Sequence, residues 1–440
     1  MSKPSLSVCM IVKNEERFLA DCLASVKDVA DQIVVLDTGS TDGSADIARR
    51  FGAEVYKYEW RDDFADARNA SIKYARGDWI FWLDADERLL AESRTALREA
   101  LTTEKKPVVY EIQINNHTLD DANAYLSTAY RLFRNGQGIA FYGRIHEQVG
   151  FTKKQGEVRP AHIVLEHLGY ALDSQTDAAK KERNQRLLER MVAEEPDNAY
   201  AHFTLGQHYN LMKRYTDGVR HLEKAREIGG LGKPLTASLY TILSETYHKL
   251  GASEQAERMA RESIHLESCQ VGAWFMLYQL ARARQDWDEA LTYLDTMAEH
   301  NRTIREKGRT LPNDVLFEDL KIDITRAEIY ASAGLYGRGF EIVAGYINRG
   351  NKDNRLWRRA LDFALQAERW DDAEQLATAL FRQNQSDLSL LDTLGKIYIK
   401  QQRFHEATQV FEALTAQQPA HTDYRRILDH LRTLNPQPMH

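Results

Sequence analysis

The chain has few cysteines and no long apolar run. Its 440 residues include only Cys9, Cys22 and Cys269, too few and too scattered for a disulfide framework or a zinc site. No apolar segment approaches the ~20 residues needed to cross a bilayer as a helix. No positively charged stretch precedes an apolar one at the N-terminus, so a signal peptide is not predicted. We therefore expect a cytoplasmic protein without a transmembrane segment.

Positively charged residues are fewer than negatively charged ones. The sequence holds 58 Lys and Arg against 65 Asp and Glu, a formal net charge of −7. This balance is the opposite of a nucleic-acid-binding surface, so we expect no nucleic-acid partner. The apolar content of 43% is enough for buried cores, and the length allows two or three domains.

The most informative segment is an apolar run at 79–83 that is followed at once by two acids, Asp84 and Asp86. Side chains two residues apart share one side of a strand, so these carboxylates can converge on one hard cation where the strand ends. Carboxylate oxygens suit Mg²⁺ or Mn²⁺, and such ions are commonly shared with substrate phosphates. Taken alone, the same residues could also form a solvated acidic turn.

Strands and helices alternate upstream of this segment. Periodicity predicts strands and helices in the order 6–12, 17–26, 32–37, 44–51 and 53–58. This order is typical of a parallel α/β sheet, whose ligands bind beyond the carboxyl ends of the strands. Polar residues follow three of the predicted strands, at 13–15, at Asp37 and at Asp84. They predict a pocket for a nucleoside diphosphate.

Four blocks in this region resemble the inverting, GT-A-fold glycosyltransferases of family 2. The blocks are 10–16, 34–43, 67–70 and 81–86. The match is dense over about the first 90 residues and looser to about residue 175. Within the family the chain is most similar to the soluble bacterial branch that carries helical repeats and includes the sublancin peptide S-glycosyltransferase. The resemblance implies an α/β N-terminal GT-A domain, Rossmann-like, with a mostly parallel sheet.

The resemblance also implies roles for single residues. The nucleotide-sugar would be bound by Val12, Asn14, Glu15, Asp37, Arg68, Asp84 and Ala85. Among them, Asp37 would accept hydrogen bonds from the nucleobase, and Glu15 would line the ribose and base. A divalent cation, Mn²⁺ or Mg²⁺, would be held by Asp86, with Asp84 contacting ribose or a metal-bound water. Arg68 would lie near the base or diphosphate, although it could also be a surface ion-pair partner.

Transfer by this chemistry requires a base. Negative charge develops on the diphosphate leaving group, which a divalent cation neutralises, while a carboxylate on the opposite side can deprotonate the acceptor. Family members commonly carry an acid near the segment 143–149, so Glu147 is the first choice for this base. His146 is its competitor, because imidazole is also a capable base near neutral pH. The alternative is an exposed His–Glu turn without a catalytic role.

Three further residues are candidates for the same site. Several GT-A enzymes recruit a late histidine as a third metal ligand, and His167 stands at the expected place, although a core or second-layer histidine is an alternative. Arg131 and Arg134 could assist the diphosphate or the acceptor.

The composition changes after about residue 177 to Leu, Ala, Glu and Arg with a helical period. The pattern of the tetratricopeptide repeat recurs about six times, and Trp357 and Leu391 share one repeat position 34 residues apart. Small residues such as Gly206 and Gly218 would let paired helices pack closely. We expect a GT-A domain at 1–176, a linking helix at 177–197 and an all-α solenoid of repeats at 198–433.

These features predict a metal-dependent inverting glycosyltransferase that moves a sugar from a nucleotide-sugar, by expectation a UDP-sugar, to a protein or peptide selected by the repeats. A cell-surface or lipid-linked glycan is the alternative acceptor, and a non-catalytic repeat scaffold with a degenerate transferase fold is a second alternative. The apolar repeat surface is compatible with a homodimer. We also expect a cut after about residue 185 to spare donor hydrolysis and to abolish acceptor modification.

Overall fold

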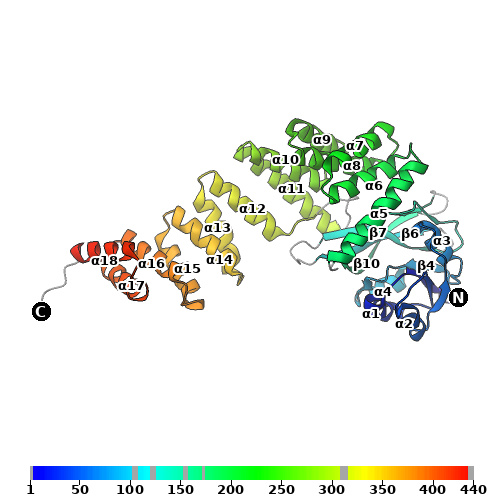
Figure 1. Cartoon of the computed structure of the whole chain (residues 1–440), viewed down its shortest axis with the longest axis horizontal. Coiled ribbons are helices and arrows are strands. Elements are labelled where there is room, and N and C mark those ends of the chain that lie inside the picture. The colour runs from blue at the N-terminus through cyan, green and yellow to red at the C-terminus, as the bar shows by residue number, and fades with distance from the viewer. Residues whose placement is uncertain are drawn as a thin grey trace. The chain divides into compact units, whose positions relative to one another are not determined.

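The structure is a computed structural model that describes residues 3–101, 108–118, 125–151, 157–170, 174–307 and 316–434 (Figure 1). The chain forms two compact units. The first contains Met1–Leu277 and Glu299–Leu316, and the second contains Tyr278–Ala298 and Phe317–His440. Within the described residues, no helix is both long enough and apolar enough to cross a membrane.

The first unit begins with an eight-stranded sheet in the order β3-β2-β1-β4-β7-β6-β10-β5. Its first four strands pair in parallel and are β1 (Leu6–Val12), β2 (Gln32–Asp37), β3 (Glu54–Lys57) and β4 (Trp79–Trp82). β1, β2 and β4 coincide with the apolar runs of the sequence, whereas β3 is short and only partly buried. Strands that are covered on both faces are apolar along their whole length, and this makes them readable from sequence.

The rest of the sheet is mixed. β7 (Tyr125–Arg134) runs antiparallel to β4 and to β6 (Val108–Thr118). β10 (Glu157–Tyr170) is parallel to β6 and antiparallel to the short β5 (Glu87–Leu89). A separate hairpin consists of β8 (Ala140–Tyr142) and β9 (Gln148–Gly150).

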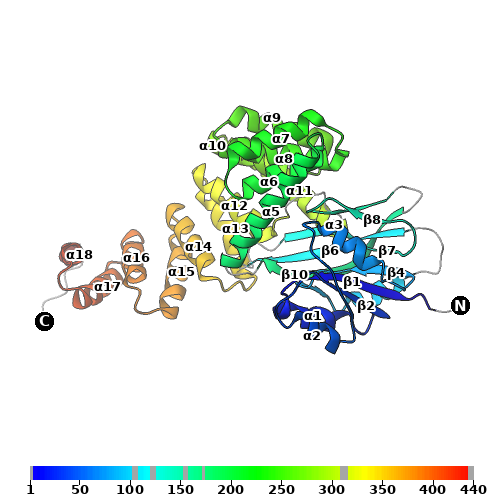
Figure 2. The same cartoon turned by 45° about the vertical axis from the view of Figure 1, so that its right-hand side comes forward.

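Helices cover both faces of the sheet (Figure 2). On one face, α1 (Glu16–Val26), α2 (Ser44–Arg50) and α4 (Ser93–Ala100) bury apolar side chains against the strands. On the other face lie α3 (Phe64–Ile72) and the β8–β9 hairpin, around a smaller core that includes Trp82 and Phe141. The carboxyl ends of β2, β1 and β4 are neighbours, so the loops that follow them meet at one edge, where ligands of such sheets bind.

A long helix, α5 (Ser174–Glu194), leads from the sheet into a series of helix pairs. The first pairs are α6 (Ala199–Leu211) with α7 (Tyr215–Ile228), and α8 (Lys233–Lys249) with α9 (Ser253–Leu266). The backbones of α6 and α7 approach closely, because a Cβ atom on Gly206 would lie 2.6 Å from Leu222 Cγ. This contact confirms the expected role of small residues in the pairs.

The helical pattern continues to the end of the described chain. It comprises α10 (Val271–Ala283), α11 (Trp287–Lys307), α12 (Asp319–Ser332), α13 (Tyr336–Asn348), α14 (Asn354–Gln366), α15 (Trp370–Gln383), α16 (Leu388–Lys400), α17 (Phe404–Gln417) and α18 (Thr422–Leu434). In the second unit, an ion pair of 2.6 Å between Arg403 and Glu374 links α16–α17 to α15. The predicted fold class, an α/β domain followed by an all-α repeat array, is confirmed.

Candidate active site

Two arginines and three carboxylates form a continuous charged cluster beyond the end of β4. Arg68, on α3, ion-pairs with Glu147 and donates through Nη2 to Asp84 Oδ1 at 2.8 Å. Arg131, on β7, reaches Asp84 Oδ2 at 3.4 Å and Glu87 Oε1 at 2.6 Å. Both arginine side chains are buried. Asp84 therefore links the Arg68–Glu147 pair to the Arg131–Glu87 pair.

The indole of Trp82 orients both arginines. The Arg131 guanidinium carbon lies 3.4 Å from the ring centroid, and that of Arg68 lies 4.3 Å away. Cations at such distances are attracted to the electron-rich face of an aromatic ring. The indole is itself fixed, since its Nε1 donates to the Tyr130 carbonyl at 2.7 Å. The guanidinium groups are thus held by charge at their ends and by stacking on their faces.

This arrangement keeps Asp84 ionised. Burial alone would raise the pKa of its carboxyl, but the charges of Arg68 and Arg131 outweigh burial and lower that pKa well below the ordinary value. Both carboxylate oxygens of Asp84 face arginine nitrogens. The role of Asp84 as a metal ligand stays a prediction.

Asp86 lies instead beside His167. The Nε2 atom of His167 is 3.4 Å from Asp86 Oδ2, and its Nδ1 atom is 2.9 Å from Asn116 Oδ1. The Asn116 amide nitrogen donates to Ser127 Oγ and to the Ile114 carbonyl, so its oxygen faces the imidazole and accepts from Nδ1–H. Burial would lower the pKa of His167, but the hydrogen bond to Asp86 and its charge outweigh burial and raise it.

These two residues fit a divalent cation. A carboxylate oxygen and an imidazole nitrogen are both accepted by Mn²⁺, and a histidine ligand normally has its second nitrogen hydrogen-bonded, as Asn116 provides here. Over the described ranges, no group of three or more His, Cys, Asp and Glu side chains could hold a metal ion. The remaining ligands would then come from substrate phosphate and water, as is common for Mg²⁺-type sites.

The loops after β1 and β2 are hydrogen-bonded to each other. Asn14 has a positive φ of 56° and accepts from the Thr41 N–H at 2.8 Å. Asp37 is buried and accepts from the Ser40 N–H at 2.8 Å through Oδ1. The Val12 carbonyl accepts from the Thr38 N–H at 2.9 Å. These contacts place the predicted nucleotide-binding residues at one edge of the sheet.

Two more of the predicted residues lie close to Asp86. Burial, reinforced by the charge of Asp86, raises the pKa of Glu15 to about 7. Ala85 is buried, and its carbonyl accepts from Arg88 at 3.1 Å. Asp42 accepts from the Ser44 N–H at 3.0 Å, in the turn that leads into α2.

The loop that carries Glu147 is packed against helices from beyond the sheet. Ile145 is buried in a cluster with Leu187 and Leu188 of α5 and with Leu205 and Tyr209 of α6. The side chain of Glu147 is only 10% exposed. A chain cut after about residue 185 would lose these contacts, so this packing favours the opposite prediction, that donor hydrolysis depends on the helices after that point.

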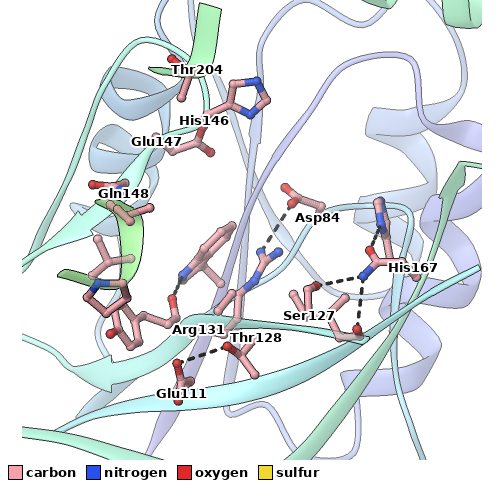
Figure 3. A pocket seen from close by; sticks show the side chains of 18 of the residues that line it. Asp84, Glu111, Ser127, Thr128, Arg131, His146, Glu147, Gln148, His167 and Thr204 are labelled. Atoms are coloured by element: carbon pink, nitrogen blue, oxygen red, sulfur yellow. Dashed lines mark hydrogen bonds and ion pairs between the residues drawn. The ribbon is translucent and has the colours of Figure 1, made fainter. Parts of the chain in front are cut away.

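A cavity of about 810 Å³ opens in front of this cluster. Its walls come from β6, β7, the Glu147 loop, α6 and the start of α8, and its lining includes Glu147, Asp84, Glu87, Arg131, His146 and His167. Figure 3 shows Glu147 and Asp84 approaching this space from different elements. The helical part of the chain therefore builds one wall of the candidate site.

Several residues of the site were not predicted. Glu87 is 2% exposed and accepts from Arg131, although in sequence it is only the last acid of the block at 84–87. Asn116 and Tyr200 have no sequence signal, because each is an ordinary polar or aromatic residue of a strand or a helix. Arg134, which was predicted with Arg131, lies over the Trp79 ring at 5.4 Å, at the far end of β4 from Asp84.

Comparison with known proteins agrees with this geometry. Residues 7–153 match the sequence profile described as Glycosyl transferase family 2. The N-terminal domain belongs to glycosyl transferase family 2. Residues 197–266 and 364–431 match tetratricopeptide repeat profiles. The match to the family 2 domain contains Arg68, Asp84, Asp86, Arg131 and Glu147, and it ends before His167.

Three curated proteins are each similar to part of the chain. A TPR repeat-containing protein of Synechococcus elongatus is 38% identical over 46% of this chain and 51% of its own length. The SPbeta prophage-derived glycosyltransferase SunS of Bacillus subtilis is 28% identical over 50% of this chain and 53% of its own. The lipopolysaccharide core biosynthesis glycosyltransferase LpsC of Rhizobium meliloti is 28% identical over 37% of this chain and 63% of its own. The chain thus spans about half the length of the first two of these relatives.

Proposed function

We propose that the chain is a metal-dependent, inverting glycosyltransferase that moves a sugar from a UDP-sugar to a protein or peptide. The observation that carries the proposal is the position of Glu147 and Asp84 around one cavity, with Asp86 and His167 beside it, in a family 2 domain. Inversion follows from the family resemblance.

The donor would occupy the edge formed by the loops after β1, β2 and β4. Asp37 and Glu15 would contact the nucleoside, and Asp86 with His167 would hold the divalent cation at the diphosphate. When bound, the cation neutralises the charge that develops on the nucleoside diphosphate as it leaves. The ionised Asp84 is kept in place by Arg68 and Arg131, so its charge is fixed before the substrate arrives.

Glu147 would act as the base. Its carboxylate takes the proton of the acceptor group while the acceptor atom bonds to the sugar carbon and the bond from that carbon to the diphosphate breaks. Arg68 orients the carboxylate, and the two side chains are only 8% and 10% exposed. His146 lines the same cavity and stays the competing candidate.

The acceptor would enter the cavity from the helical side. On that side the cavity is lined by Tyr200, Phe203, Thr204 and Gln207 of α6 and by Leu235 of α8. This contribution of the first repeats supports an acceptor that the repeats select, which favours a protein or peptide. The relative named for lipopolysaccharide core biosynthesis supports a glycan acceptor as the second candidate.

The test is release of nucleoside diphosphate from UDP-, GDP- and dTDP-sugars, with Mn²⁺ and with EDTA. We expect release from a UDP-sugar that depends on Mn²⁺ and is lost in Asp86→Asn. The exposed Asp46→Asn on α2 is the matched control and should behave as the wild type. Absence of both nucleotide binding and release with every donor would overturn the proposal and favour the scaffold alternative.

A further inference from the structure

The loop that carries Glu147 contains two residues in the left-handed region of backbone conformation. Gly143 has φ 92° and His146 has φ 53°. Glycine adopts this conformation without cost, whereas a residue with a side chain, such as His146, does so only when its surroundings hold it there. The loop therefore depends on outside contacts for the conformation that presents Glu147 to the cavity.

Several contacts hold the first half of the loop. The Phe64 N–H donates to the Arg144 carbonyl at 2.8 Å, and the Arg144 side chain ion-pairs with Glu194 of α5 at 2.6 Å. Ile145 is buried against α5 and α6. These contacts end one residue before the left-handed position, so they leave the orientation of the peptide between His146 and Glu147 to another group.

That group is Tyr200, in the first turn of α6. Its hydroxyl donates to the His146 carbonyl at 2.9 Å. This carbonyl belongs to the peptide that joins His146 to Glu147, so the hydrogen bond fixes the direction in which the Glu147 side chain leaves the backbone. Burial raises the pKa of Tyr200 to about 12 and outweighs a hydrogen bond with Gln148 that lowers it, so the hydroxyl keeps its proton at neutral pH.

Glu147 is consequently held at two points that lie on different parts of the chain. Arg68 of the family 2 domain binds its carboxylate, and Tyr200 of the first helical repeat binds the peptide before it. Either contact alone would let the residue pivot about the other. Tyr200 also lines the cavity together with Thr204 and Gln207, one and two turns further along α6.

We propose that Tyr200 is a positioning residue of the active site, through which the first helical repeat sets the placement of the base. The inference rests on the proposed role of Glu147. It goes further by making the first repeat part of the catalytic machinery in addition to any part in selecting the acceptor.

The direct test is hydrogen exchange of the backbone amides at 143–149 in Tyr200→Phe. This change keeps the ring and removes only the hydroxyl. The matched control is Tyr247→Phe on α8, whose hydroxyl donates to Glu223 at 2.6 Å within the repeats. We expect exchange in the loop to accelerate about fivefold in Tyr200→Phe, the factor for loss of one hydrogen bond, and to stay unchanged in Tyr247→Phe. Equal exchange in both variants would overturn the inference.

The second test measures turnover in the full-length chain. For nucleoside diphosphate release with Mn²⁺ and the UDP-sugar, we expect kcat of Tyr200→Phe to fall about tenfold to a hundredfold while the affinity for UDP is unchanged. In a Glu147→Gln background the same change should have no further effect, because the base it positions is absent. An equal loss in both backgrounds would assign Tyr200 a general structural role and overturn the proposal.

The two tests separate this inference from the proposed function. Hydrogen exchange needs no substrate, so it reports on the contact even if no donor is turned over. A loop that loosens while kcat stays at the wild-type value would refute the positioning of the base and leave the glycosyltransferase proposal intact.

Discussion

Arg68 ion-pairs with Glu147, a residue 79 positions further along the chain. The side chains are 8% and 10% exposed, so removal of Arg68 leaves the Glu147 carboxylate with little contact with water. The pair joins α3 of the sheet domain to the loop that the helices support. Loss of this pair would therefore lower both the stability of the protein and its catalytic activity.

The first prediction concerns the stability of this pair. Arg68→Met should destabilise the protein by about 3–5 kcal/mol, because it leaves Glu147 buried without a partner. Adding Glu147→Gln to that variant should recover part of the loss, since no uncompensated charge then remains. Urea denaturation measures both. The exposed pair of Arg76 with Glu54 is the control, for which Arg76→Met should destabilise the protein far less.

The second prediction concerns the base. Glu147→Gln should lower sugar transfer about 10²- to 10⁴-fold and leave UDP binding unchanged, because the amide keeps the shape but cannot take a proton. His146→Gln, made in parallel, should retain most of the activity. The reverse pattern would move the base to His146. Calorimetry of UDP binding and initial rates of transfer provide the two readings.

The third prediction concerns the divalent cation. His167→Gln should raise the Mn²⁺ concentration for half-maximal activity by about tenfold or more, because an imidazole nitrogen beside Asp86 is lost. His162→Gln, an exposed histidine on the same strand β10, is the control. A Mn²⁺ titration of nucleoside diphosphate release gives the values. If both variants titrate as the wild type does, His167 does not bind the metal.

The fourth prediction concerns pH. The pKa of Glu15 is raised from 4.5 to about 7 by burial and by the charge of Asp86. The folded protein therefore binds this proton more tightly than the unfolded chain, and the stability it contributes is present below about pH 4.5 and is lost as the pH rises through about 7. With EDTA present, Glu15→Gln should raise Tm relative to the wild type more at pH 8 than at pH 5. The exposed Glu99→Gln should differ in Tm from the wild type by the same amount at both pH values.

The fifth prediction concerns truncation. A chain ending after residue 185 should lose donor hydrolysis, because it lacks Leu187 and Leu188, which are fully buried beneath Ile145. Burial of each such leucine stabilises by about 1.5–3 kcal/mol. A chain ending after residue 266, which keeps α5 to α9, should retain more of the activity. Equal hydrolysis by both truncations would show that the helices do not support the loop.

Much of the fold is readable in the sequence because the relevant signals are local. β1, β2 and β4 are apolar on both faces, and the helix pairs repeat small residues at fixed spacing. β6 and β7 gave no comparable signal. Their polar residues, such as Glu111, Asn116, Thr128 and Arg131, line the cavity or the charged cluster, so the strands do not alternate clearly between apolar and polar residues.

Part of the candidate site could likewise be predicted from the sequence, and part could not. The acids after β1, β2 and β4 could be found because strand ends in a parallel sheet share one edge. The pairing of Asp84 with two arginines could not, since Arg68 and Arg131 come from distant segments and only folding brings them to the faces of Trp82. The contact of Tyr200 with the His146 carbonyl is equally invisible, because one partner is a backbone atom.

The hydrogen bond from α6 to the Glu147 loop limits where two such proteins can be joined in a chimera. A chimera that joins the family 2 domain of one chain to the helices of another at the end of the profile match, near residue 153, would combine a loop with a foreign α5 and α6. The junction should lie after α6 at the earliest, so that the loop keeps its own Tyr200 and Leu205. By the same reasoning, substitutions at the first repeat should be tolerated less well than substitutions at repeats without such contacts.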